Sequence, residues 1–192
     1  MPNHTIFNER PESQDRALKV IEKLGYTIVP RSEAEKKRGS RRAVLFTEEL
    51  QSFLSHQMYQ FGTEERYFSG GSIAKAMQTM DQFSAAGLYA ENKTIYELLC
   101  AGKSMEEDLP DGTRQSFDLS FIDFEHPENN TFQVTDEFEV ERPNGKFARP
   151  DIVVLVNGIP LVVIECKKSS VDVMEGVNQN IRNWGEEYIP HL

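Results

Sequence analysis

The sequence lacks any apolar run of about 18 residues, the length that a membrane-spanning helix requires. It also lacks the basic-then-apolar beginning of a secretory signal peptide. Only two cysteines occur, Cys100 and Cys166, and they stand far apart without the spacing of metal ligands, so buried thiols are expected rather than a disulfide. These absences predict a soluble, cytoplasmic protein with no membrane partner.

Positive charge is also scarce. The 192 residues include 21 Lys and Arg against 31 Asp and Glu, for a net charge of −10. This is the wrong sign for a protein that grips nucleic acid over its whole surface, so any such role must be local or shared with a partner. The segment 31–42 alone concentrates basic residues, and we interpret it as a solvated connector in which 36–42 could touch phosphate.

Apolar residues recur at helical spacing through the first half of the chain. The pattern predicts helices over about 11–25, 44–61, 72–83 and 92–101, within a helical region of about 1–105. Gly102-Lys103-Ser104 looks like the end of a phosphate-binding loop, but Glu97 occupies the position where such a loop needs glycine. We therefore predict no ATP site in this chain.

From about residue 116 the apolar period changes to two, which is typical of strands. The pattern predicts a meander of four strands over about 116–168, followed by a helix over about 171–188. Both faces of the 151–167 hairpin are apolar, so helices should cover both sides of the sheet. The expected fold is α/β (α+β): one domain, 1–192, with a central mixed sheet of four or more strands flanked by helices.

Three charged residues flank the apolar runs of this hairpin, "ARPDIVVLVNGIPLVVIECKK". Glu165 and Lys167 are two apart in a strand and share a face. A strict two-residue turn would set Asp151 opposite Ile164 and send Asp151 and Glu165 to opposite faces. An odd loop or a bulge pairs them instead, and Pro160 favours the odd loop because it cannot donate a ladder hydrogen bond.

Two adjacent carboxylates repel each other unless a cation lies between them. Oxygen ligands suit Mg²⁺ or Mn²⁺, and the backbone carbonyl of Cys166 could supply another oxygen. Such an ion activates water and neutralises phosphate charge, while Lys167 can orient the water, so the group fits phosphodiester cleavage. The alternatives are a charged, exposed hairpin end, or an ion pair between Lys167 and one carboxylate.

The stretch "RPDIVVLVNGIPLVVIECKK" resembles the PD-(D/E)xK nuclease motif. Together with the upstream "FIDFEHPENNTFQVTDEFEV", it resembles the N-terminal nuclease domain of type I restriction enzyme R (motor) subunits. The resemblance is close over about 116–168 and looser forward to "IPHL" and back to "KLGY".

The resemblance implies a restriction-endonuclease-like fold and a divalent-metal-dependent DNA endonuclease without sequence specificity of its own. Such a domain is attached to the motor domains of the same subunit, which use ATP and are absent from this chain, and works with methyltransferase and specificity subunits. The chain is then expected to be an N-terminal fragment of a larger subunit or a truncated gene product.

Residue by residue, the resemblance makes Asp151 and Glu165 metal ligands and Lys167 the catalytic lysine. Gln179 fits the first position of the family's Gln-x-x-x-Tyr pattern, although Asn183 replaces the tyrosine. Related nucleases place an acidic metal contact on the first helix. Here the helical face of Leu18 and Ile21 extends to Gln14, which leaves Glu12 as the candidate. The other candidate DNA contacts are Lys168, Arg149 and Arg182.

Two other functions remain open from the sequence. One is a non-catalytic module of the same fold that docks partner subunits. The other is a stand-alone DNA repair or junction-cleaving nuclease.

Overall fold

The computed structural model describes residues 12–81, 88–141 and 145–166, together with 174, 177, 178 and 181. Its elements in chain order are α1 (Glu12–Lys23), β1 (Thr27–Val29), α2 (Arg31–Arg38), α3 (Thr47–Ser55), β2 (Met58–Phe61), β3 (Glu64–Tyr67), α4 (Gly70–Asp81), α5 (Leu88–Ala101), β4 (Lys103–Asp108), β5 (Arg114–Leu119), a 3₁₀ turn η1 (Pro127–Asn129), β6 (Phe132–Asp136), β7 (Val140–Glu141), β8 (Phe147–Ala148), β9 (Ile152–Val156) and β10 (Ile159–Ile164).

Four strands form a central mixed sheet in the order β1-β6-β9-β10. Strand β1 runs parallel to β6, whereas β6 and β10 both run antiparallel to β9. Every residue of β9 is buried, while β10 lies at the edge and is partly exposed. The predicted α/β fold with a mixed, restriction-endonuclease-like sheet is therefore confirmed.

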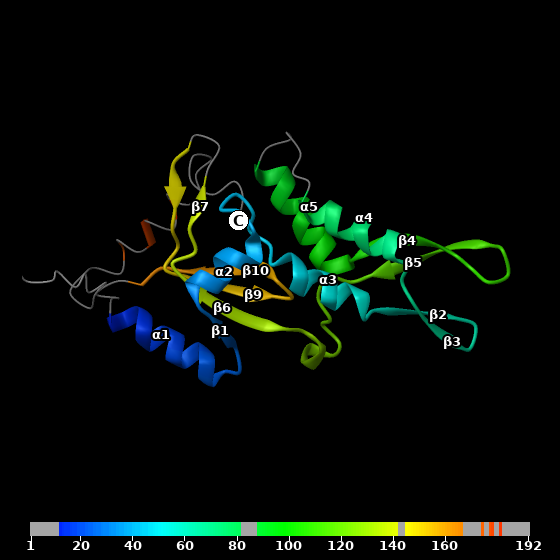
Figure 1. Cartoon of the computed structure of the whole chain (residues 1–192), viewed down its shortest axis with the longest axis horizontal. Helices are drawn as coiled ribbons and strands as arrows, with labels where there is room; N and C mark the ends of the chain where they lie inside the picture. The colour runs from blue at the N-terminus through cyan, green and yellow to red at the C-terminus, as the bar shows by residue number, and fades with distance from the viewer. Residues whose placement is uncertain are drawn as a thin grey trace, which may run out of the picture.

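Helices cover both faces of this sheet, as predicted (Figure 1). On one face, Leu18 and Ile21 of α1 pack against Val134, Ile152 and Val154. The other face belongs to the larger core, whose buried members from β9 and α3 include Val153, Leu155, Leu50 and Leu54. Alternation along β9 thus sends successive valines into two separate apolar clusters.

Helix α1 ends where the sequence indicates. The last helical residue is Lys23, and Gly25 adopts a left-handed conformation with φ of 97°. The Gly25 N–H donates to the carbonyl of Glu22 at 2.9 Å, which satisfies one of the last helical carbonyls. The chain then turns directly into β1.

Two predictions in the first half are wrong. The helix expected over 44–61 ends at Ser55, and Met58–Phe61 instead pairs with Glu64–Tyr67 as a hairpin around Gly62, whose φ is 62°. The segment 31–42 is a helix over Arg31–Arg38 rather than a connector. The segment has few apolar residues, so no helical period was visible in it. Its stabilising contacts come instead from carboxylates elsewhere in the chain, such as Glu49, Glu137 and Glu139.

The predicted four-strand meander is also wrong, because its first strand, β5, does not belong to the central sheet. Strand β5 pairs with β4 in a separate hairpin, and β1 takes the place beside β6 in the central sheet. β1 has only three residues, too few to show a period of two. The supposed helical region 1–105 therefore contributes a strand to the sheet.

The helix predicted over 171–188 lies largely outside the described residues; the described positions 174, 177, 178 and 181 are helical. Among the described helices, none combines the length and the apolar character that crossing a membrane would need.

Candidate functional site at the open end of the β9–β10 hairpin

The hairpin turn is a strict two-residue turn, so the predicted odd loop is wrong. Val156 pairs with Ile159, and both turn residues have positive φ, 52° at Asn157 and 78° at Gly158. A Cβ on Gly158 would lie 2.4 Å from the carbonyl oxygen of Phe46, whose N–H donates to the Gly158 carbonyl at 2.9 Å. The positive φ angles favour Asn and Gly at the two turn positions. The close approach to the start of α3 leaves no room for a side chain at position 158.

Asn157 holds the turn to the loop that precedes β6. Its side chain is fully buried; Nδ2 donates to the Phe121 carbonyl at 3.0 Å and to Asn130 Oδ1 at 2.8 Å. Its Oδ1 accepts the N–H of Thr131 at 2.8 Å. The segments "HPENN" and "NG" are thus joined by hydrogen bonds at the closed end of the hairpin.

A bulge at Leu161 corrects the register, which confirms the second alternative predicted from the sequence. Pairing shifts between Pro160 and Val162, after which Val163 faces Val153 and Ile164 faces Ile152. Continued one residue beyond the paired strands, the same register would set Glu165 opposite Asp151. Pro160 is tolerated within the pairing because β10 is an edge strand of the sheet.

Asp151 is held by three hydrogen bonds from three separate segments of the chain. Its Oδ2 accepts the N–H of Cys166 at 2.7 Å, which ties it to the end of β10. Its carbonyl accepts the N–H of Glu137 at 2.9 Å and Nε2 of Gln14 at 3.0 Å. Gln14 is 1% exposed. Sequence reasoning gave this glutamine no role, although its place on the buried face of α1 was a usable signal.

The donor set fits a lightly held divalent ion. The part of the chain that the structure describes contains no group of three or more His, Cys, Asp or Glu suited to a metal. Mg²⁺ commonly binds through one or two carboxylates and keeps several waters, so the pair Asp151 and Glu165 is sufficient in type. A carboxylate has about four lone-pair sites, and one N–H bond to Asp151 leaves capacity for an ion.

Of the other predicted site residues, only Arg149 has a described side chain. Arg149 is exposed, two positions before Asp151. Glu12 begins α1, but its side chain is not described, and Lys167, Lys168, Gln179 and Arg182 lie outside the described residues. The cysteines are free thiols; Cys166 is partly buried, whereas Cys100 is exposed, which corrects the prediction of a buried thiol there.

The sequence matches a family model described as "Type I restriction enzyme R protein N terminus" over residues 6–192. The chain belongs to this family. The type I restriction enzyme HindI endonuclease subunit of Haemophilus influenzae is 30% identical over 185 residues, which cover 91% of this chain and 16% of that protein. The SsaAORF53P endonuclease subunit of Staphylococcus saprophyticus is 40% identical over 70 residues, 36% of this chain and 7% of that protein. The chain thus spans a small part of these relatives' length.

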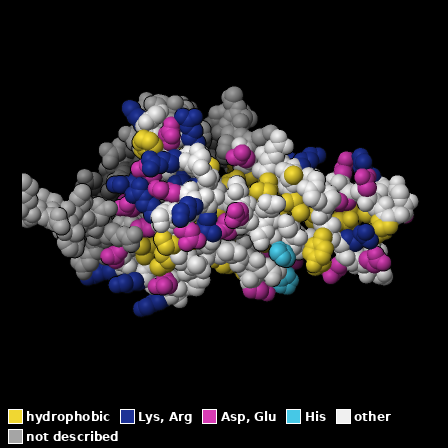
Figure 2. All heavy atoms as spheres, viewed as in Figure 1, with side chains coloured by type: hydrophobic (Ala, Val, Ile, Leu, Met, Phe, Trp, Pro, Cys, Tyr) yellow, Lys and Arg dark blue, Asp and Glu magenta, His cyan; other side chains and the backbone are white. Residues whose placement is uncertain are grey.

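Several cations of the basic segment 31–42 pair with glutamates. Arg31 Nη1 lies 2.7 Å from Glu137, Arg41 lies 2.8 Å from Glu139, and Lys37 pairs with Glu49. The ion pair with Glu49 raises the pKa of Lys37 above its ordinary value, since the carboxylate favours the charged amine. Figure 2 shows blue and magenta side chains intermixed on this part of the surface. This pairing argues against the 36–42 segment as a ready phosphate contact.

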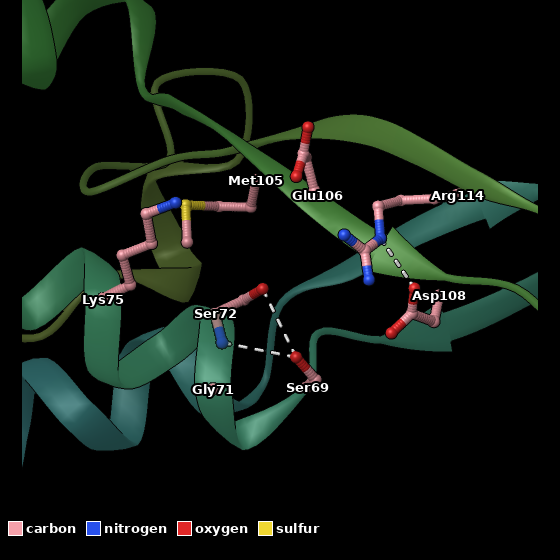
Figure 3. Close-up of a pocket in the computed structure, with 8 residues that line it drawn as sticks. All are labelled: Ser69, Gly71, Ser72, Lys75, Met105, Glu106, Asp108 and Arg114. Atoms are coloured by element: carbon pink, nitrogen blue, oxygen red, sulfur yellow. Dashed lines mark hydrogen bonds and ion pairs between the residues drawn. The ribbon is translucent and has the colours of Figure 1, made fainter.

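A hollow of about 260 Å³ lies between the start of α4 and the β4–β5 hairpin (Figure 3). Lys75 and Arg114 line it and suggest an anion site. However, Arg114 donates to Asp108 at 2.7 Å, and both the N–H and the hydroxyl of Ser69 lie 3.1 Å from Glu107 Oε1. The protein's own carboxylates occupy the positions that an anion would take.

Proposed function

We propose that this chain is the DNA-cleaving domain of a type I restriction enzyme R subunit. It would hydrolyse phosphodiester bonds with Mg²⁺ or Mn²⁺ and without sequence specificity of its own. The observation that carries the proposal is the bulged register of the hairpin, which, continued one residue beyond Ile164 and Ile152, would set Asp151 opposite Glu165 at its open end. The printed names of the relatives, endonuclease subunits of type I restriction enzymes, support the same function.

Each residue has a distinct task in this proposal. Asp151 and Glu165 hold the ion, with the Cys166 carbonyl as a third oxygen. When bound, the ion supplies positive charge that stabilises the phosphate and makes water a better nucleophile. Lys167 lies two residues beyond Glu165 and orients the water or stabilises developing charge. Arg149, Lys168, Gln179 and Arg182 touch the DNA backbone.

DNA delivery falls to other parts of the enzyme. With a net charge of −10, the domain has little general attraction for phosphate, and no base-reading motif is visible in its sequence. Motor domains of the same subunit would bring DNA to the site with ATP, and methyltransferase and specificity subunits would choose where the complex loads.

Metal binding is the first test. Mn²⁺ titrated into the 192-residue chain by calorimetry should give a binding signal that Asp151→Asn and Glu165→Gln each abolish or weaken at least about tenfold, because each removes a charged ligand. Asp81→Asn, at the exposed end of α4, is the matched control and should bind normally. Unchanged Mn²⁺ binding in both site variants would remove the basis of the assignment.

Lys167→Ala distinguishes catalysis from docking. In a reconstituted complete enzyme, this variant should lose double-strand cleavage while it keeps Mn²⁺ affinity and ATP hydrolysis, since Lys167 acts on water or phosphate rather than on the metal. A docking module predicts normal cleavage in the same preparation.

The third possibility, a stand-alone repair or junction nuclease, shares this site and differs in its neighbours. Gene sequence flanking this reading frame distinguishes it, because only an R subunit would adjoin motor domains.

A further inference from the structure

A wide groove lies away from the candidate nuclease site. Its volume is about 1010 Å³, and its walls come from α3, the β2–β3 hairpin, the end of α5 and the loop 120–131. Asp151 and Asn157 stand at opposite ends of β9, roughly 20 Å apart at about 3.3 Å per residue. The groove contains Thr131, which bonds Asn157, so it lies at the end of the sheet remote from Asp151.

The charge of the groove has one sign. Its described lining includes the carboxylates Glu49, Glu65, Asp123 and Glu125 and contains no Lys or Arg. Glu49 is paired with Lys37, while Glu65 and Glu125 are exposed. Hydrogen bonds from the Asn129 amide and the His126 N–H lower the pKa of Asp123, so this carboxylate stays ionised at neutral pH.

Apolar side chains stand out among these carboxylates. Phe124 is 62% exposed and Met58 is 48% exposed, although both belong to well-bonded segments. His56 and His126 also line the groove. An exposed phenylalanine on a concave, charged surface is typical of an interaction site.

The loop that presents Phe124 is fixed before any partner arrives. Asn130 accepts the N–H of Asp123 at 2.9 Å and donates to its carbonyl at 2.7 Å. Gln57 bonds both the carbonyl and the N–H of Ser120, which joins the loop to the segment after α3. A partner would therefore lose little affinity to ordering this side of the interface.

We propose that this groove binds a protein segment that carries Lys or Arg beside apolar side chains. Phe124 and Met58 would pack on the apolar side chains of the segment, and Glu65, Asp123 and Glu125 would pair with its cations. DNA does not fit this chemistry, because its phosphates would meet carboxylates. The inference goes beyond the nuclease proposal and does not depend on it.

The test uses the full 192-residue chain and a fluorescent synthetic helix of Leu and Lys, with a Leu and Glu peptide as its charge-reversed control. Fluorescence anisotropy should detect binding of the Lys peptide alone. Phe124→Ser should weaken it at least about tenfold, as expected for a buried aromatic anchor. The double variant Glu65→Gln with Glu125→Gln should weaken it and reduce its salt dependence.

Matched variants separate the groove from general charge attraction. Leu24→Ser removes an exposed apolar side chain after α1, and Glu22→Gln with Asp81→Asn removes two exposed charges elsewhere. These controls should bind the Lys peptide normally, and all variants should keep the thermal melting of the unaltered chain. Equal affinity across all variants, no binding by the unaltered chain, or stronger binding of the Glu peptide would overturn the proposal.

Discussion

The side-chain amide of Gln14 donates a 3.0 Å hydrogen bond to the backbone carbonyl of Asp151, 137 positions later in the chain. The first helix therefore fixes the backbone that carries a candidate metal ligand. Gln14 is 1% exposed, so this hydrogen bond is shielded from solvent.

Gln14→Met keeps the volume but removes the donor. We expect a loss of about 1–3 kcal/mol in the free energy of unfolding and weaker Mn²⁺ binding, because Asp151 is less firmly placed. Urea unfolding and calorimetry measure the two effects. Gln78→Met, on the exposed face of α4, should change neither. A variant with full stability and full Mn²⁺ affinity would show that the bond positions nothing.

Gly158→Ala tests the closed end of the hairpin. A Cβ there would lie 2.4 Å from the Phe46 carbonyl oxygen, on a residue with φ of 78°. Gly112 has φ of 80° but nothing within 4 Å of a Cβ, so Gly112→Ala meets only the conformational cost of about 1–2 kcal/mol. We expect Gly158→Ala to lower the free energy of unfolding by at least about 2 kcal/mol more than Gly112→Ala does, because of the steric clash. Equal effects of the two substitutions in chemical denaturation would show that the approach to Phe46 does not constrain the turn.

Arg38 and Arg42 allow a comparison of buried and exposed cations. Arg38 is 5% exposed, lies 3.9 Å above the Phe138 ring and donates to the Glu139 carbonyl at 2.9 Å. Arg38→Met should cost about 2–4 kcal/mol of unfolding free energy, because it removes packing and leaves a carbonyl unpaired. Arg42 pairs with Glu141 at the surface, and Arg42→Met should cost less than about 1 kcal/mol. Similar losses in urea unfolding would reject the distinction.

The pair Asp123 and Asn129 should couple in a pH-dependent way. The Asn129 amide lowers the pKa of Asp123 below its ordinary 3.8, so the ionised form stabilises the fold above that pH. This stabilisation falls as the pH drops through the folded-state pKa. A double-mutant cycle of Asp123→Ala and Asn129→Ala should show coupling at pH 7 that shrinks in acid. Coupling that is constant with pH, or absent at neutral pH, would contradict this.

Patterns confined to one segment were readable from the sequence. The helices α1, α4 and α5 and the strands of the hairpin followed from periodicity. The bulge followed from the alternation that Asp151 and Glu165 need in order to share a face. Features that depend on distant partners were not readable. Helix α2 is stabilised by Glu137 and Glu139, and β1 is recognisable only through its pairing with β6.

In the candidate site, too, the local features were predictable and the contacts with distant segments were not. The two carboxylates came from local alternation, whereas Gln14 required knowledge of which strand α1 crosses. The predicted odd loop failed because Pro160 was judged without its place at the sheet edge, where a missing N–H costs nothing.

The single unpaired residue at Leu161 makes the hairpin tolerant of a change in length. A hairpin one residue shorter, with the same two-residue turn and no bulge, would still bring the two carboxylates face to face. The spacing between these acidic residues in related chains is therefore free to differ by one, and a search that demands a fixed interval would miss relatives in which the two residues share a face in the same way.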